Sequence, residues 1–227
     1  MNRIGRAWRL ARTHIGLEKF KREADTRLDR PAELIALLFE YSREFFRPFQ
    51  IKEELTELVR EVRELNPSNV LEIGTAKGGT LFLWTRLAQR NATIVSIDLP
   101  GGKFGGGYSK RQEAVYRRFP GKSQKMHLLR EDSHAQATLD RTKQLFEHRP
   151  IDLLFIDGDH TFDGVKRDWE MYSPLVRSGG MIVFHDIAGN YEDTQVKKLW
   201  DSVKSDFKYH EYAFDQNGYY GIGILYK

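Results

Sequence analysis

The chain has 227 residues, of which 40% are hydrophobic and 30% are charged. That composition is ordinary for a globular protein, and the length suits one domain with a sizeable core. The absence of cysteine excludes a disulfide framework, a thiolate nucleophile and a zinc–thiolate site. No apolar run approaches the roughly 18 residues of a membrane span, and the start lacks the apolar core of a secretion signal, so we expect a cytoplasmic protein.

The net charge of +4 is distributed unevenly along the chain. Residues 1–30 hold nine Lys and Arg against four Asp and Glu, which leaves residues 31–227 with a net charge of −1. A protein that binds nucleic acid through its main domain is expected to carry a basic surface there. The sequence therefore predicts no nucleic-acid partner.

Residues 1–65 are predicted to form a helical extension ahead of a main domain of residues 66–227. An amphipathic basic helix is indicated near the start, because apolar residues recur at helical spacing with arginines between them. Its apolar positions are Ile4, Trp8, Ala11 and Ile15. Two further helices are expected over Pro31–Phe46 and Ile51–Leu65, with Pro31 suited to a first helical turn.

The apolar face of the first helix needs a partner, because an isolated helix is marginal in water. A substrate cleft, a second subunit and an anionic membrane surface are the three alternatives. Four arginines and no acid in residues 1–17 fit weak peripheral membrane contact, but the apolar stripe is short for stable anchoring.

From Val70 onward, short apolar runs alternate with helical patterns. The predicted strands are Val70–Ile73, Thr93–Ile97, Met126–Leu129, Asp152–Ile156 and Met181–Phe184. The predicted helices are Gly79–Arg90, Ser109–Phe119, Ser133–Glu147, Phe162–Leu175 and Glu192–Val203. This alternation is typical of an α/β fold with a doubly wound, Rossmann-like and mostly parallel sheet. Two last strands, Tyr209–Phe214 and Tyr220–Tyr226, are predicted to form an antiparallel hairpin at the edge, because Asn217-Gly218 lies between them.

The first strand of this series ends in a glycine turn with the spacing Gly-x-x-x-Gly-Gly, from Gly74 to Gly79. Glycines let a ligand approach the backbone, and the first N–H groups of the following helix favour an anion. Asp98 ends the next strand, where it can accept hydrogen bonds from ribose hydroxyls. Glu72, just before the turn, suits a ligand with an ammonium group. The alternative is a tight strand–helix connection without a ligand.

A third contributor follows the third strand, in Glu131-Asp132-Ser133-His134. This segment is placed to contact an adenine ring. Asp132 or Ser133 could equally cap the next helix, and one residue can do both.

Two further strands end in side chains that bind metals or transfer protons. The fourth strand opens into Asp157-Gly158-Asp159-His160, and the fifth opens into His185-Asp186. Ligands of open α/β sheets bind beyond the carboxyl ends of the strands. Carboxylates suit Mg²⁺ or Mn²⁺, whereas histidine shifts the preference toward softer ions. The sequence therefore predicts a site at this edge that holds a divalent cation.

Taken together, Glu72-x-Gly74-x-x-x-Gly78, Asp98, Asp132-Ser133 and the two acidic strand ends resemble the class I S-adenosylmethionine-dependent methyltransferases. The resemblance is strongest to the metal-dependent O-methyltransferases, namely the catechol type and the bacterial branch that acts on macrolide sugars, and it covers about Val70–Lys227. It implies S-adenosylmethionine as the cofactor and a hydroxyl of a small molecule, a sugar or natural product, as the methyl acceptor. The residues implied to bind the cofactor are Glu72, Gly74, Thr75, Gly78, Thr80, Asp98, Asp132, Ser133, His134 and Asp157.

The same resemblance implies roles at the reacting end. The metal ligands of the catechol type are an Asp after the fourth strand and an Asp-Asn pair after the fifth, which match Asp157, His185 and Asp186. His185 departs from the acid of that pattern, and a histidine that faces the substrate without a metal is its alternative. His160 stands where the catechol type has a catalytic lysine and the macrolide-sugar branch a histidine, so it is implied as the general base. A helix-capping or core histidine is the alternative for His160.

Three acids near this site are given structural roles. Asp159 is expected to cap the helix that begins near Phe162, and Asp163 and Asp168 are expected on the surface of that helix.

Two other functions compete with the methyltransferase. One is an NAD(P)-dependent oxidoreductase, although the glycine spacing fits a dinucleotide poorly. The other is a cofactor-binding scaffold without activity, which joins a complex through residues 1–65. Because related small-molecule methyltransferases use N-terminal helices as lids and in dimers, the resemblance favours both roles for residues 1–65 and a homo-oligomer.

Overall fold

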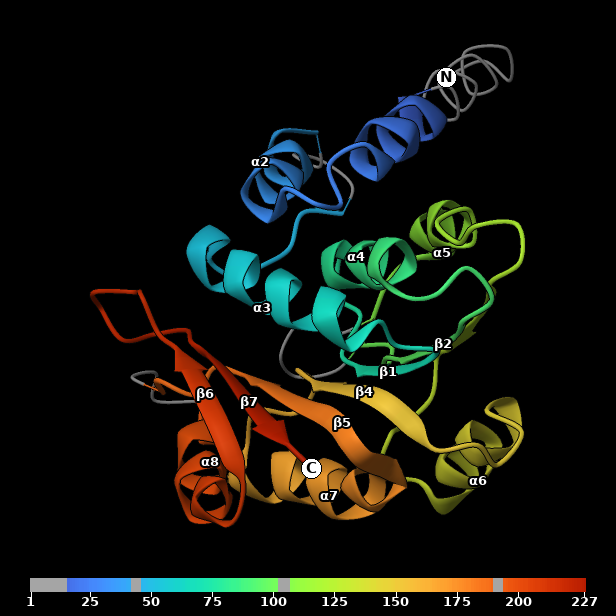
Figure 1. Cartoon of the computed structure of the whole chain (residues 1–227). Coiled ribbons are helices and arrows are strands. Elements are labelled where there is room, and N and C mark those ends of the chain that lie inside the picture. Colours follow the sequence, from blue (N-terminus) through green and yellow to red (C-terminus); the bar gives the residue numbers. More distant parts are fainter. Residues whose placement is uncertain (1–15, 42–45, 102–106, 190–193) are drawn as a thin grey trace.

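The computed structural model describes residues 16–41, 46–101, 107–189 and 194–227. Its centre is a seven-stranded sheet in the order β3-β2-β1-β4-β5-β7-β6, shown in Figure 1. β7 runs antiparallel to both of its neighbours, and the other pairs are parallel. The strands are β1 Asn69–Ile73, β2 Thr93–Ile97, β3 Lys125–Leu129, β4 Ile151–Ile156, β5 Val176–His185, β6 Lys208–Tyr212 and β7 Ile222–Tyr226. The predicted mostly parallel, Rossmann-like sheet with an antiparallel edge is confirmed.

The register of the sheet brings the carboxyl ends of its strands to one edge. Ile73 at the end of β1 pairs with Ile97 of β2 and with Ile156 of β4. Ile156 in turn pairs with Phe184 of β5. Residues that follow these strands in the sequence are therefore neighbours in space. Strands β1, β2 and β4 are buried at every position, as expected of strands covered on both faces.

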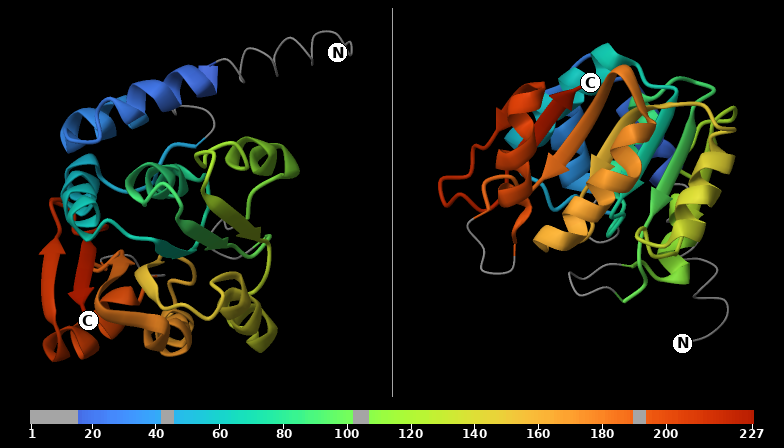
Figure 2. Two further views of the ribbon diagram at one scale, coloured as in Figure 1. Left: turned by 45° about the vertical axis from the view of Figure 1, so that its right-hand side comes forward. Right: turned by 90° about the horizontal axis from the view of Figure 1, so that it is seen from below.

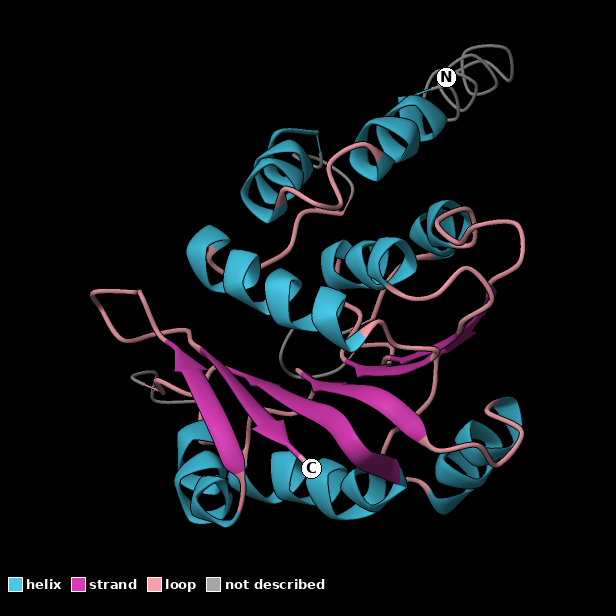
Figure 3. Ribbon diagram, in the orientation of Figure 1, coloured by secondary structure: helices cyan, strands magenta, loops and turns pink. Residues whose placement is uncertain are grey.

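Helices cover both faces of the sheet, as Figure 3 shows by secondary structure and Figure 2 from two further sides. One face carries α3 (Lys52–Leu65), α4 (Gly79–Leu87) and α5 (Lys110–Tyr116). The other carries α6 (Gln136–Leu145), α7 (Phe162–Tyr172) and α8 (Val196–Val203). Two short 3₁₀ turns, Ser173–Leu175 and Lys204–Asp206, follow α7 and α8. Each face has its own apolar core, so the strands are buried between two helical layers.

The amino-terminal region packs onto the α4 side of the sheet. Residues 16–25 are helical, which the sequence reasoning missed, and α2 (Pro31–Tyr41) follows. Leu17 and Phe20 are buried in the same core as α3 and α4. The amphipathic helix predicted around Ile4–Ile15 lies outside the described residues.

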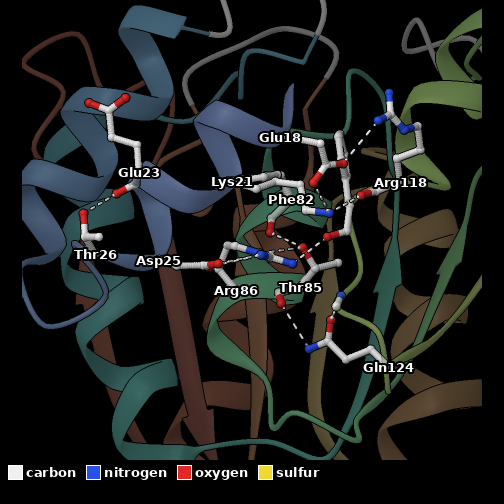
Figure 4. Close-up of polar contacts among 12 residues, drawn as sticks. Glu18, Lys21, Glu23, Asp25, Thr26, Phe82, Thr85, Arg86, Arg118 and Gln124 are labelled. Atoms are coloured by element: carbon white, nitrogen blue, oxygen red, sulfur yellow. Dashed lines mark hydrogen bonds and ion pairs between the residues drawn. The ribbon is translucent and has the colours of Figure 1, made fainter. Parts of the chain in front are cut away.

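Polar contacts fasten this helix to α4 and to the end of α5 (Figure 4). Lys21 donates to the carbonyl oxygen of Arg118 over 2.7 Å. Arg86 of α4 lies 3.1 Å from Asp25 and also donates to the carbonyl oxygen of Phe119. The described residues between 16 and 65 therefore share a core with the sheet, and α3 belongs to one of its two helical layers.

The carboxyl-terminal hairpin differs in detail from the expected tight turn. Residues 213–221 form a loop between β6 and β7, with Gly218 in the left-handed region at φ +68°. His185 pairs with Ile222, so this loop lies beside the carboxyl end of β5. None of the helices in the described ranges has the length and apolarity to span a membrane.

Candidate active site

The turn between β1 and α4 depends on two glycines with positive φ. Gly74 has φ +93° and Gly78, the N-cap of α4, has φ +74°. A Cβ at Gly74 would lie 1.9 Å from the backbone carbonyl oxygen of Asp157, and one at Gly78 would lie 2.8 Å from the ring of Tyr116. A side chain fits at neither position, so the glycines allow the ends of β1 and β4 to meet.

Glu72 of β1 is enclosed by protein donors. Its Oε1 accepts from Thr80 over 2.6 Å and from the indole of Trp84 over 2.8 Å, while Oε2 accepts from Ser96 over 2.6 Å. Burial raises the pKa of this carboxyl to about 7 against the effect of those hydrogen bonds. Thr75 extends the network, because its hydroxyl lies 2.6 Å from that of Ser96. In this arrangement the carboxylate holds α4 and β2 to β1 through hydrogen bonds from Thr80, Trp84 and Ser96.

Asp98 lies directly after β2 and is 5% exposed. Its Oδ2 accepts from the backbone N–H groups of Thr75 and Ala76, over 3.1 and 2.7 Å, and its Oδ1 accepts from Gly107 over 2.7 Å. Burial raises the pKa of Asp98, and these N–H groups oppose that rise. A carboxylate offers about four acceptor positions, so three protein donors leave room for one more on Oδ1.

The segment after β3 is built around a buried ion pair. His134 Nε2 lies 3.3 Å from Asp168, which is fully buried, and 3.1 Å from the carbonyl oxygen of Gly164. The hydrogen bond to Asp168 raises the pKa of His134. Asp132 accepts from the backbone N–H of His134, and the carbonyl of Ser133 accepts from Tyr172. The expectation of a surface Asp168 is therefore wrong: it anchors the segment to α7.

Four side chains meet beyond β4 and β5. His185 Nδ1 lies 3.1 Å from Asp157 Oδ1 and 3.0 Å from Asp186 Oδ1. His160 lies between the same two acids, with Nε2 3.4 Å from Asp157 and Nδ1 3.3 Å from Asp186. The structure thus brings together Asp157, His160, His185 and Asp186, which the sequence placed on two separate strand ends.

The two histidines and two acids perturb one another strongly. Burial would raise the pKa of Asp157, but His185 and His160 hold that pKa well below its usual range. Burial would lower the pKa of His185, yet the two acids raise it to about 9. Burial would also lower the pKa of His160, but Asp157 and Asp186 raise it above its ordinary value. Such groups at strand ends are typical of a functional site.

Asp157, His160 and Asp186 lie close enough together to hold a divalent cation, and His185 lies against the same two acids. One ligand atom each from Asp157, His160 and Asp186 lies within 4.8 Å of the others. The expected set held His185 in place of His160. Asp186 Oδ1 is buried without a hydrogen bond among the described residues, and Asp186 has φ +63°, a strained conformation for a residue with a side chain.

Two details of the site escaped the sequence reasoning. Gln50, in the segment before α3, donates from Nε2 to Asp157 Oδ2 over 2.7 Å. The only signal of this in the sequence is a polar residue between Phe49 and Ile51. The N-cap of α7 is Thr161, whose hydroxyl accepts from Gly164, so the expected cap at Asp159 is wrong. Asp159 instead accepts from the backbone and hydroxyl of Thr161.

The family model of the methyltransferase domain matches residues 71–187, just over half of the chain, from within β1 to just beyond the end of β5. The chain belongs to the methyltransferase domain family. This confirms the family that the motifs indicated and decides against the oxidoreductase. A relative, protein R132 of Acanthamoeba polyphaga mimivirus, is 30% identical over 179 residues, which cover 78% of each chain.

Solved structures share the fold of this methyltransferase. The MycE methyltransferase of the mycinamycin pathway, in complex with Mg, SAH and mycinamycin VI, has a TM-score of 0.57 at 18% identity; the alignment covers 85% of this chain and 53% of MycE. This chain thus spans about half of MycE. An O-methyltransferase of Bacillus cereus in complex with SAH has a TM-score of 0.54 at 15% identity, covering 93% of this chain and 100% of the other. TomG of Streptomyces achromogenes, in complex with SAM, has a TM-score of 0.55 at 15% identity, covering 87% and 90%.

Proposed function

We propose that this protein is an S-adenosylmethionine-dependent O-methyltransferase that methylates a hydroxyl of a small molecule with the help of a divalent cation. The observation that carries the proposal is the meeting of Asp157, His160 and Asp186 beside the Gly74 turn, in a chain of the methyltransferase family. The reaction needs a methyl donor and a proton acceptor side by side, and in this proposal the turn at Gly74 holds the donor while His160 accepts the proton.

The cofactor is proposed to lie along the ends of β1, β2 and β3. Gly74 and Gly78 keep the turn open to a ligand, and Asp98 has one acceptor position left for a ribose hydroxyl. Ser133 and His134 are held by α7 and suit the adenine end. Support comes from the neighbouring folds, whose structures hold SAH or SAM. We assign Glu72, Thr75 and Thr80 to the support of the turn, since they bond one another or Ser96.

The cation is proposed to be Mg²⁺ or Mn²⁺, held by Asp157 and Asp186 with His185 as a third ligand, so that His160 can act as the base. When bound, it would orient the acceptor oxygen and lower the pKa of the acceptor hydroxyl. Oδ1 of Asp186 supports this assignment, because it is buried and accepts no hydrogen bond among the described residues, with His185 Nδ1 3.0 Å away as its ion-pair partner. The raised pKa of His185 provides an alternative positive charge between the same acids.

His160 is proposed as the group that takes the proton from the acceptor. Its ring is held by two carboxylates, which stabilise the protonated imidazole and make it a stronger base. The backbone carbonyl of His160 accepts from Gln195 over 2.7 Å, which fixes the residue at the start of α7.

A sugar or natural-product acceptor is proposed on the basis of exposed aromatic side chains near the site. Phe214 and Tyr219 belong to the loop of residues 213–221 beside His185, and Phe49 precedes Gln50; they are 53%, 39% and 57% exposed. Aromatic side chains commonly line small-molecule sites. The MycE structure, which has a related fold, holds mycinamycin VI.

Residues 1–65 are proposed to serve as a lid, with a homo-oligomer contact as a second role. The segment of residues 46–51 reaches the site through Gln50, which supports the lid. Because α3 packs in the core of the sheet, this proposal divides the chain at residue 65 by function and not by packing.

The proposal is tested by incubating the full chain with S-adenosylmethionine, Mg²⁺ and a panel of hydroxylated sugars, macrolides and phenols, and by measuring S-adenosylhomocysteine. We expect product with at least one acceptor and a large loss in His160→Ala. An exposed variant of α7, Asp163→Ala, serves as the matched control. Binding of S-adenosylmethionine without turnover on any acceptor would favour the scaffold instead.

A further inference from the structure

The segment of residues 46–51 lies against the parts of the fold that hold the cofactor in the proposed function. A Cβ at Gly79, the first residue of α4, would lie 2.4 Å from the backbone nitrogen of Pro48. Lys77 of the glycine turn places its Nζ 4.6 Å from the centre of the Phe49 ring. Gln50 then reaches Asp157 at the end of β4. The segment thus contacts α4, the turn and β4 in succession.

Gln50 presents an acceptor atom to which none of the described residues donates. The residue is 5% exposed, and its Nε2 is committed to Asp157 over 2.7 Å. The carboxylate determines the orientation of the amide, because the reverse orientation would set Oε1 against a negative oxygen. Oε1 is buried and has no hydrogen-bond donor among the described residues. A buried amide oxygen without a donor costs free energy, so a ligand donor is expected there.

The position of this oxygen indicates which donor it receives. Oε1 shares a carbon with Nε2 and so lies beside the Asp157 carboxylate. The backbone of Asp157 in turn touches Gly74, where a Cβ would meet its carbonyl oxygen at 1.9 Å. A neutral and a charged acceptor side by side suit an ammonium, which has three N–H donors, better than a hydroxyl, which has one. Glu72, expected from the sequence to bind an ammonium, already accepts from Thr80, Trp84 and Ser96.

We infer that Gln50 binds the α-ammonium of the cofactor's methionyl group through Oε1, while its Nε2 orients Asp157. The inference rests on the proposed function, because it needs an S-adenosyl amino acid in the site. It makes Gln50 a cofactor-binding residue that comes from outside the region matched by the family model. Residues 46–51 would then be ordered together with the cofactor.

The test measures calorimetric binding of S-adenosylhomocysteine and of its analogue without the α-amino group. Three proteins are compared: wild type, Gln50→Met, which keeps the side-chain length, and Glu53→Met, an exposed control in the first turn of α3. We expect Gln50→Met to weaken the binding of S-adenosylhomocysteine by about 10- to 100-fold. The affinity for the analogue should stay within about 2-fold of that of wild type. Glu53→Met should change neither affinity.

Several results would overturn the inference. Equal weakening of both ligands by Gln50→Met would mean that Gln50 only supports the fold. Unchanged affinities with a raised acceptor KM would assign Oε1 to the acceptor. Wild-type protein alone is also decisive, because equal binding of the two ligands would exclude any contact with the ammonium even if the variant fails to fold. Absence of S-adenosylhomocysteine binding to wild type would instead refute the proposed function, and the inference with it.

Discussion

Two carboxyl groups near the ends of neighbouring strands have pKa values shifted in opposite directions. Glu72 of β1 is surrounded by neutral donors from Thr80, Trp84 and Ser96, and burial raises its pKa to about 7. Asp157, after β4, lies against two histidines that hold its pKa below the usual range despite burial. Burial penalises both charges, so the charge of the neighbours decides which carboxylate stays ionised.

This difference separates a structural region from a reactive one. The hydrogen bonds of Glu72 hold β1, β2 and α4 together, and their hydroxyl and indole donors are neutral groups. The cluster around Asp157 holds two acids and two histidines that can share protons or a cation. We therefore expect changes at the β4–β5 end to act on turnover and changes at Glu72 to act on stability.

The largest expected effect is on turnover in His160→Ala. Because His160 is proposed to act on the acceptor proton in the transition state, kcat should fall by about 10²–10⁴-fold. Cofactor affinity should change little, and calorimetry with S-adenosylmethionine provides that control. Near-native turnover of the variant from pH 6 to 9 would remove His160 from the reaction.

A smaller effect is expected on cofactor affinity in Asp98→Ala. The variant loses a charge-assisted hydrogen bond to the ribose, which should weaken binding of S-adenosylmethionine by about 1.5–3 kcal/mol. Calorimetric titration measures the change. An unchanged affinity would show that Asp98 accepts hydrogen bonds only from the backbone N–H groups and none from the ribose.

Glu72→Gln should alter the pH dependence of stability. The folded pKa of Glu72, about 7, lies above its unfolded value, so the folded state binds the proton more tightly. Its contribution is therefore complete below about pH 4.5 and is lost as pH rises through 7. Relative to wild type, the neutral variant should gain on the order of 2 kcal/mol in the free energy of unfolding between pH 5 and 9.

Urea unfolding at several pH values measures this gain. Turnover at pH 7 should stay within a few-fold of wild type, in contrast to His160→Ala. If the unfolding free energies of the variant and the wild type differ by the same amount at every pH, the pKa of Glu72 is not raised in the folded state.

The smallest expected effect follows removal of the divalent cation. Excess chelator should lower kcat by about 10-fold, and Mg²⁺ or Mn²⁺ should restore it. The loss is modest because the raised pKa of His185 keeps a positive charge between Asp157 and Asp186. Full turnover in chelator, with metal-free protein by elemental analysis, would leave the histidines as the only activating groups.

The sheet and the edge at which the site lies could be predicted from local sequence patterns. Met181–Phe184, for example, is a continuous apolar run, and its burial follows from that local pattern. Gly74 and Gly78 indicated the turn because their conformations are confined to a few residues. Asp98, Asp157 and Asp186 could be predicted at one edge because parallel strands align their carboxyl ends.

The contacts that each of these side chains makes follow from how the helical layers and the sheet pack together. The donors of Glu72 come from α4 and β2, the partner of His134 comes from α7, and Gln50 lies 107 positions from Asp157. No local periodicity records such contacts, because they depend on how layers far apart in the sequence pack. The same holds for His160 and His185, since the choice of a third cation ligand depends on the approach of the β4 and β5 ends.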